Sequence, residues 1–196
     1  MKKIYAILVV MSLSLPSFAQ DYISTLSYNM GMAVEGSDMA EFIDDVSYKG
    51  FSMGSRQYLS RFSSVGFEVG WNVFDKKEYG TFDQDNITAT GTQIRYINAF
   101  PIMLNYHLYM GNRRGIRIYF GAGAGTYYIE QRQQLGLFAV TTSNWHFGLA
   151  PEAGLLIPMG RTTSLNVSAK YNYAFEAGDS KGYQYWGLNV GFAFKH

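Results

Sequence analysis

The feature that most constrains this chain is a period of two in its hydrophobic residues. In residues 65–73, one face of the segment carries Val, Phe, Val, Trp and Val, and the other carries Gly, Glu, Gly and Asn. Successive side chains of a β-strand point to opposite faces, so this pattern predicts a strand with one apolar face. Comparable alternation recurs in residues 94–108, 116–125, 145–157, 165–176 and 186–194.

Two weaker segments, residues 22–34 and 48–60, bring the number of expected strands to eight. The connections between strands alternate in length. The short ones lie near residues 62–64, 111–115 and 158–161, and the longer ones span residues 35–46, 75–91, 131–143 and 177–182. Short turns at one end and longer loops at the other are typical of an up-and-down antiparallel meander.

The composition helps to decide which way the apolar faces point. The chain is 47% hydrophobic and 17% aromatic, yet its mean hydropathy is −0.09. A soluble sandwich or soluble barrel would have to pack all three tryptophans inside and leave Gly, Ser and Asn outside. In the reverse arrangement the apolar residues face lipid, and the small polar residues fit the narrow interior of eight strands. Only a closed barrel satisfies the backbone hydrogen-bonding groups of strands in lipid. We therefore predict an all-β fold, an eight-stranded antiparallel up-and-down transmembrane β-barrel.

The first 19 residues are predicted to be a signal peptide. Lys2 and Lys3 precede an apolar run over residues 4–15, and the small residues Ser17 and Ala19 suit a signal peptidase. The barrel domain is then expected over residues 20–196. Without the two lysines no basic excess remains, so nucleic acid is not an expected partner. The chain has no cysteine, which excludes disulfides, thiol nucleophiles and cysteine-bound metals.

Aromatic residues are expected to form two belts. If the amino-terminal leader lies on the inner side, the short turns are periplasmic and the longer loops extracellular. Trp71, Trp145 and Trp186 then fall near the extracellular ends of their strands. The residues expected near the opposite rim are Tyr106, Phe192 and Phe194. Such belts are typical of both membrane interfaces.

Three low-complexity motifs carry a resemblance to a known family. They are residues 121–128 (GAGAGTYY), 148–154 (GLAPEAG) and 191–194 (GFAF). On these the chain resembles the eight-stranded outer-membrane β-barrel proteins of Gram-negative bacteria, of the porin-like or OmpX/OmpA-barrel type. The resemblance implies a location in the cell outer membrane, contact with lipid and lipopolysaccharide, and insertion by the barrel assembly machinery. Members of this family often end on an aromatic residue that the assembly machinery recognises. Here Lys195 and His196 follow Phe194, so this recognition signal is shifted from the last position.

Six charged residues are expected on the inward faces of the strands. They are Arg56, Glu68, Arg95, Arg117, Glu152 and Lys170. Mirroring positions about the short turns places Arg56 diagonally near Glu68, and Glu152 diagonally near Lys170. Paired charges suit a lumen of low dielectric constant. We interpret the set as a plug that rigidifies the barrel, with a conducting path as the alternative.

The remaining polar features predict no catalytic residues, no metal site and no cofactor. His146 is expected to face inward near Glu130 and Glu176, but the sequence does not specify a triad. The segment 35–46 holds five acidic residues and no basic one, and is interpreted as a solvated acidic rim. We expect a structural or surface-interaction role through the segments 35–46 and 75–91, in adhesion or envelope integrity. A narrow porin and a lipid A-modifying enzyme remain the alternatives.

Overall fold

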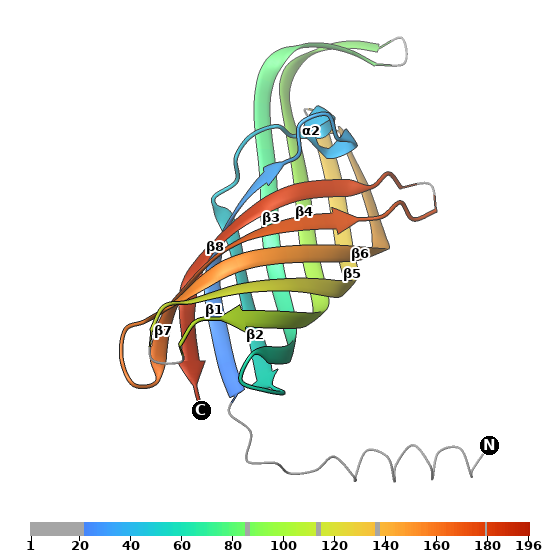
Figure 1. Cartoon of the computed structure of the whole chain (residues 1–196). Coiled ribbons are helices and arrows are strands. Elements are labelled where there is room, and N and C mark those ends of the chain that lie inside the picture. The colour runs from blue at the N-terminus through green and yellow to red at the C-terminus, as the bar shows by residue number, and fades with distance from the viewer. Residues whose placement is uncertain (1–21, 85–86, 113–114, 136–137, 179) are drawn as a thin grey trace, which may run out of the picture.

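The protein is a closed barrel of eight antiparallel strands in the computed structural model, which describes residues 22–84, 87–112, 115–135, 138–178 and 180–196. The expected signal peptide lies outside these residues. Each strand pairs with the next, and the last pairs with the first, so the sheet closes without a free edge (Figure 1). The strands are β1 (Tyr22–Ala33), β2 (Lys49–Tyr58), β3 (Ser63–Gln84), β4 (Ile87–Met110), β5 (Arg117–Leu135), β6 (Phe138–Pro158), β7 (Thr163–Ala174) and β8 (Tyr183–Lys195).

The alternation of side chains along each strand is the one predicted. On β4, Leu104 is 66% exposed on the outside, whereas the adjacent Asn105 is 5% exposed on the inside. Phe67 is likewise exposed and Glu68 buried on β3. A face of large apolar side chains therefore surrounds the barrel, and most of the polar side chains lie within it. The predicted fold class is confirmed.

Four strands are much longer than predicted. The β3–β4 hairpin continues far beyond the other strands at one end of the barrel, as Figure 1 shows, and the β5–β6 hairpin is extended at the same end, with pairing up to Leu135 and Phe138. The prediction of long loops over residues 75–91 and 131–143 was therefore wrong. Beyond the membrane both faces of a strand can contact water, so the polar residues there lack the apolar alternation on which strand prediction depends.

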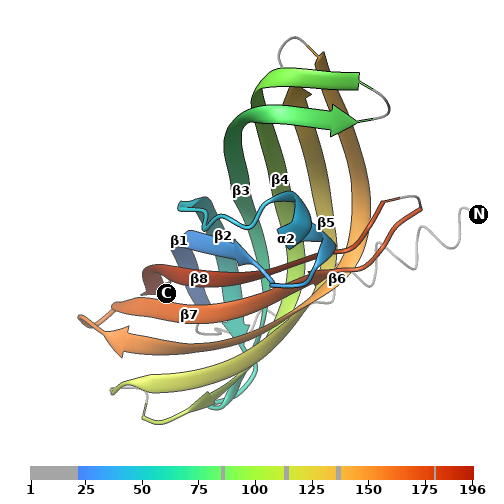
Figure 2. The ribbon, with the colours of Figure 1, turned by 90° about the horizontal axis from the view of Figure 1, so that it is seen from above.

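The segment 35–46 is not simply a solvated rim. It contains a short helix, α2 (Asp38–Phe42), whose first turn is capped by Ser37, because the Oγ of Ser37 accepts a hydrogen bond from the Ala40 amide at 3.2 Å. Met39 and Ile43 are 1% and 0% exposed. Seen from above, α2 lies over the opening of the barrel (Figure 2). The segment thus inserts apolar side chains into the mouth. Its acidic composition did not predict this insertion.

Glycines on the inner faces make room for large rings. A Cβ atom at Gly154 would lie 2.5 Å from Cζ of Tyr119, and one at Gly148 would lie 2.5 Å from Cε2 of Tyr127. Both tyrosines are fully buried. The glycine-rich sequences of β5 and β6 therefore allow a narrow barrel to be filled by aromatic rings rather than left open.

Candidate functional site

A cluster of charged side chains fills the lumen toward the end with the short turns, and Glu152 lies at its centre. Its carboxylate is 3.6 Å from Nη2 of Arg56 and 3.7 Å from Nζ of Lys170. It also accepts a hydrogen bond from the Tyr119 hydroxyl at 2.8 Å and lies 3.2 Å from Nε2 of His107. Every member is buried. One carboxylate thus binds groups from four other strands across the barrel.

The predicted pair of Glu152 and Lys170 is present at 3.7 Å, but the other pairing within this cluster differs from the predicted one. Arg56 forms its ion pair with Glu152 across the lumen, rather than with Glu68 on the neighbouring strand. Glu68 pairs instead with Lys170, which lies directly opposite Glu152 in the β6–β7 register rather than on a diagonal. Reflecting the sequence about a hairpin turn identifies only neighbours on adjacent strands. In a narrow barrel, long side chains also reach strands on the other side of the lumen.

The other two predicted lumen residues lie at opposite ends of the barrel. Near the short turns, Arg117 donates to the Tyr58 hydroxyl at 2.6 Å and to the backbone oxygen of Arg61 at 3.0 Å. At the far end, Arg95 donates to the backbone oxygen of Phe42 at 3.1 Å, and its guanidinium lies 5.5 Å from the Phe42 ring. Arg95 therefore holds α2 in place and is not part of the charge cluster.

An apolar layer closes the other half of the lumen. Met39 and Ile43 of the α2 segment pack there among buried residues from seven strands, among them Phe74, Ile97 and Tyr127. Between this layer and the charge cluster, the cavity lined by Glu68, Lys170 and several asparagines has a volume of about 10 Å³. This is room for about one water molecule. The sequence did not predict the layer, because its members come from separate segments.

His146 fixes the β7–β8 connection. Its Nδ1 lies 2.8 Å from the backbone oxygen of Phe175, and its Nε2 lies 3.4 Å from Oγ of Ser180. The expected neighbour Glu130 points to the outside of β5 instead, where it lines an outer groove. The imidazole is 1% exposed and packs edge-on against Tyr183, which leaves no access for a substrate. We interpret this contact as structural.

The predicted aromatic residues lie on the outside of the barrel. Rings from five consecutive strands contact one another in a row, with centroid separations of 5.9, 5.8, 6.1 and 5.2 Å, formed by Phe51, Trp71, Phe100, Tyr128 and Trp145. Farther round, Trp186 packs on Tyr171. Tyr106, Phe192 and Phe194 are exposed toward the opposite rim. Two levels of exposed rings fit the interfaces of a bilayer.

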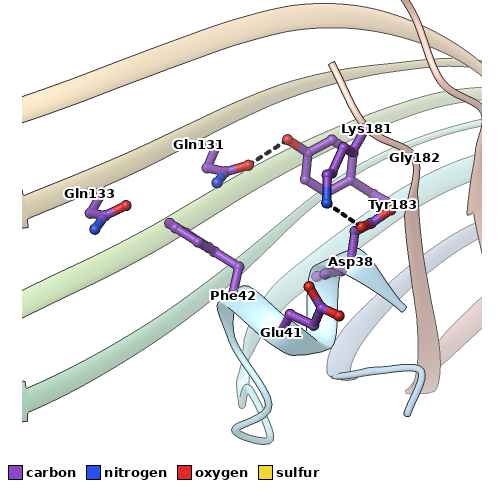
Figure 3. A pocket seen from close by; sticks show the side chains of 9 residues that line it. Asp38, Glu41, Phe42, Gln131, Gln133, Lys181, Gly182 and Tyr183 are labelled. Carbon is purple, nitrogen blue, oxygen red and sulfur yellow. Dashed lines mark hydrogen bonds and ion pairs between the residues drawn. The ribbon is translucent and has the colours of Figure 1, made fainter. Parts of the chain in front are cut away.

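A groove of about 560 Å³ lies at the mouth, between α2, β5 and the β7–β8 connection. Figure 3 shows the Phe42 ring of α2 pointing toward Gln131 and Gln133 of β5, whereas Glu41 lies beside Asp38. The Tyr183 hydroxyl donates to Oε1 of Gln131 at 2.7 Å, which braces one wall. The groove thus presents amide and carboxylate groups next to an aromatic ring.

Basic residues from other elements neutralise part of the acidic segment. Lys181 pairs with Asp38 at 2.5 Å, and Lys76 pairs with Asp44 at 2.7 Å. The hydrogen bond to Asp38 raises the pKa of Lys181, and the hydrogen bond from Lys76 lowers the pKa of Asp44. Among the described residues no three His, Asp or Glu side chains are grouped as a metal site would require. The acidic rim is therefore an anchoring surface for α2 as well as a solvated one.

Comparison with known proteins identifies the fold. No family model and no curated protein matches the sequence. Among solved structures, Neisserial surface protein A aligns with a TM-score of 0.53 at 14% identity, over 90% of this chain and 97% of that one. OprG of Pseudomonas aeruginosa aligns with a TM-score of 0.53 at 14% identity, over 91% and 96%. The amino-terminal barrel domain of OprF from the same species gives 0.52 at 16%, over 89% and 97%.

The chain has the fold of the eight-stranded outer-membrane β-barrels. No helix in the described part of the chain is long and apolar enough to cross a membrane. The apolar outer face and its two levels of aromatic rings are what lipid around such a barrel requires. The predicted outer-membrane location agrees with that of the structural neighbours. The orientation expected from the sequence puts the mouth with α2 and the long hairpins on the extracellular side and the short turns on the periplasmic side.

Proposed function

We propose that this outer-membrane barrel is a surface-recognition protein that binds an extracellular ligand in the groove beside α2. The observation that carries the proposal is the combination of a lumen filled at two levels with an open groove of about 560 Å³ above it. A filled lumen leaves the extracellular surface as the part of the protein that is free to interact. The porin alternative is disfavoured for the same reason.

The lining of the groove suggests the chemistry of its ligand. Gln133 and Glu41 both line the groove and offer hydrogen-bond donors and acceptors, and Phe42 offers an apolar ring. Paired amide and carboxylate groups beside an aromatic ring suit a molecule with many hydroxyl groups and apolar C–H faces. A surface carbohydrate has this combination, so we propose a carbohydrate as the ligand. No enzymatic step is part of this proposal.

A glycan array probed with the full chain in fluorescent nanodiscs tests the proposal. Binding to a subset of glycans is expected, with a signal above that of empty nanodiscs. Gln133→Trp should abolish this binding, because an indole at that position would occupy the groove. Adjacent side chains of a strand point to opposite faces, so Gln134→Trp is a matched control that places the same ring outside the groove.

Two results would contradict the proposal. The first is a signal no higher than that of empty nanodiscs on every glycan. The second is an equal loss of binding in Gln133→Trp and Gln134→Trp. Heat-dependent gel mobility of each variant establishes beforehand that the barrel is folded, so a loss of binding reports on the groove.

A further inference from the structure

A second groove of about 560 Å³ lies on the outer surface, directly above the aromatic row. It crosses three neighbouring strands, and its lining is Trp71, Val73, Ile94, Tyr96, Asn98, Glu130, Arg132 and Gln134. The strand register aligns these side chains in rows: Val73 is opposite Asn98, and Asn98 is opposite Glu130. Tyr96 is opposite Arg132 in the next row. The long hairpins, which the recognition groove uses on their inner face, thus form this groove on their outer face.

The height of this groove relative to the membrane follows from strand geometry. Trp71 belongs to the aromatic row that marks the extracellular interface. A strand advances by about 3.3 Å per residue, so the rows at Val73 and Asp75 lie about 7 and 13 Å beyond Trp71 along the strand. Tilt of the strands reduces these heights to about 5 and 10 Å. The groove therefore lies in the layer of lipid headgroups and just above it.

The charges in the groove are arranged from one end to the other. Asp75 is not part of the lining and forms an ion pair with Lys49 at 2.8 Å beside the groove. Glu130 accepts a hydrogen bond from Asn98 at 3.5 Å, close to the aromatic row. Farther out, the exposed guanidinium of Arg132 contacts Oε1 of Gln134 at 3.3 Å. The groove thus offers a carboxylate acceptor low on its wall and a cation above it.

We propose that this outer groove binds the phosphorylated sugar headgroup of an outer-leaflet glycolipid. The apolar surface of Trp71 and Val73 would contact the first part of the acyl chains, in continuity with the lipid-facing surface below. Sugar hydroxyl groups would donate to Glu130, and the phosphate would accept from Arg132, whose fork of N–H groups suits phosphate oxygens. This occupant explains why a cation and a carboxylate share a groove that opens toward lipid.

Native mass spectrometry of the detergent-solubilised full chain tests this inference with purified diphosphorylated lipid A as the probe. The wild type should retain the lipid, and Arg132→Gln should weaken binding by about tenfold, since a charge-assisted hydrogen bond is lost. Arg161→Gln removes a charge from a periplasmic turn and should bind as the wild type does. A large excess of inorganic phosphate should not displace the lipid, because the sugar and acyl contacts would be missing.

Three results would overturn the inference. Dephosphorylated lipid A could bind as tightly as the diphosphorylated form, Arg132→Gln could bind as tightly as the wild type, or Arg161→Gln could lose as much affinity as Arg132→Gln. The outer groove is on the opposite face of the hairpins from the recognition groove. Gln133→Trp therefore tests glycan binding, and Arg132→Gln tests lipid binding, at separate sites. Either proposal can fail while the other holds.

Discussion

At the scale of single residues, the buried charges are the costliest part of this barrel. Glu152 is buried together with Arg56 and Lys170, and Lys170 also pairs with Glu68. Removing several charges from water costs free energy, which is recovered only when each charge has partners. The cluster is balanced, with two basic and two acidic side chains, so the loss of any one charge leaves an uncompensated one inside the barrel.

The substitution Glu152→Gln should therefore destabilise the protein strongly. It leaves Arg56 and Lys170 facing a single carboxylate, and we expect the free energy of unfolding to fall by about 3 kcal/mol, the lower end for breaking a buried pair. Reversible urea unfolding in lipid vesicles, followed by tryptophan fluorescence, measures this. Glu176→Gln, at an exposed position in the β7–β8 connection, is the control. Equal stability of the two variants would contradict the role assigned to Glu152.

The glycines that accommodate the tyrosine rings give a second prediction at this scale. Gly154→Ala would place a Cβ atom 2.5 Å from the Tyr119 ring and displace the hydroxyl that donates to Glu152. We expect a loss of about 1–3 kcal/mol in the same unfolding measurement, as for other overpacked sites. Gly160→Ala in a turn with open space around it should change stability little. A Gly154→Ala variant as stable as Gly160→Ala would show that the ring can move freely.

At the scale of elements, what could be predicted depended on whether a segment lies in the membrane. Lipid on one side and lumen on the other give β4 and β6 a clear alternation, and their membrane-spanning parts were predicted correctly. Residues 75–79 of β3 have charged side chains on both faces and were taken for a loop. The contacts of the segment around α2 were beyond prediction, because Lys181 reaches Asp38 and Lys76 reaches Asp44 from distant parts of the sequence.

The attachment of α2 should depend on pH and on salt. Lys76 lowers the pKa of Asp44 below its usual value of about 4. A lowered carboxyl pKa stabilises the folded form above the unfolded pKa, and this contribution is lost as the pH falls through the folded pKa. Carbon NMR titration of Asp44 measures this pKa, which Lys76→Gln should return toward the usual value. High salt should act in the same direction, since the pair is exposed. An unchanged titration in Lys76→Gln would exclude the pairing.

At the scale of the whole molecule, the barrel is divided into levels that belong to different parts of the chain. The charge cluster comes from the strands alone, whereas the upper apolar layer also requires α2. The sequence predicted a filled lumen because eight strands enclose little space. It could not predict that filling occurs at two levels. Two blocks in series mean that opening one of them leaves the other in place.

This arrangement predicts the behaviour of the chain in planar bilayers. The wild type should give no discrete conductance steps. The double variant Met39→Ser, Ile43→Ser should loosen α2 and make the mouth accessible, yet it too should stay silent, because the ion pairs of Glu152 and Lys170 still close the lumen below. Protease cleavage within the α2 segment of the variant, but not of the wild type, would establish that the mouth has opened. Discrete steps in the wild type would support a pore and contradict a filled lumen. Steps in the double variant alone would mean that α2 is the sole block and that the charge cluster admits ions.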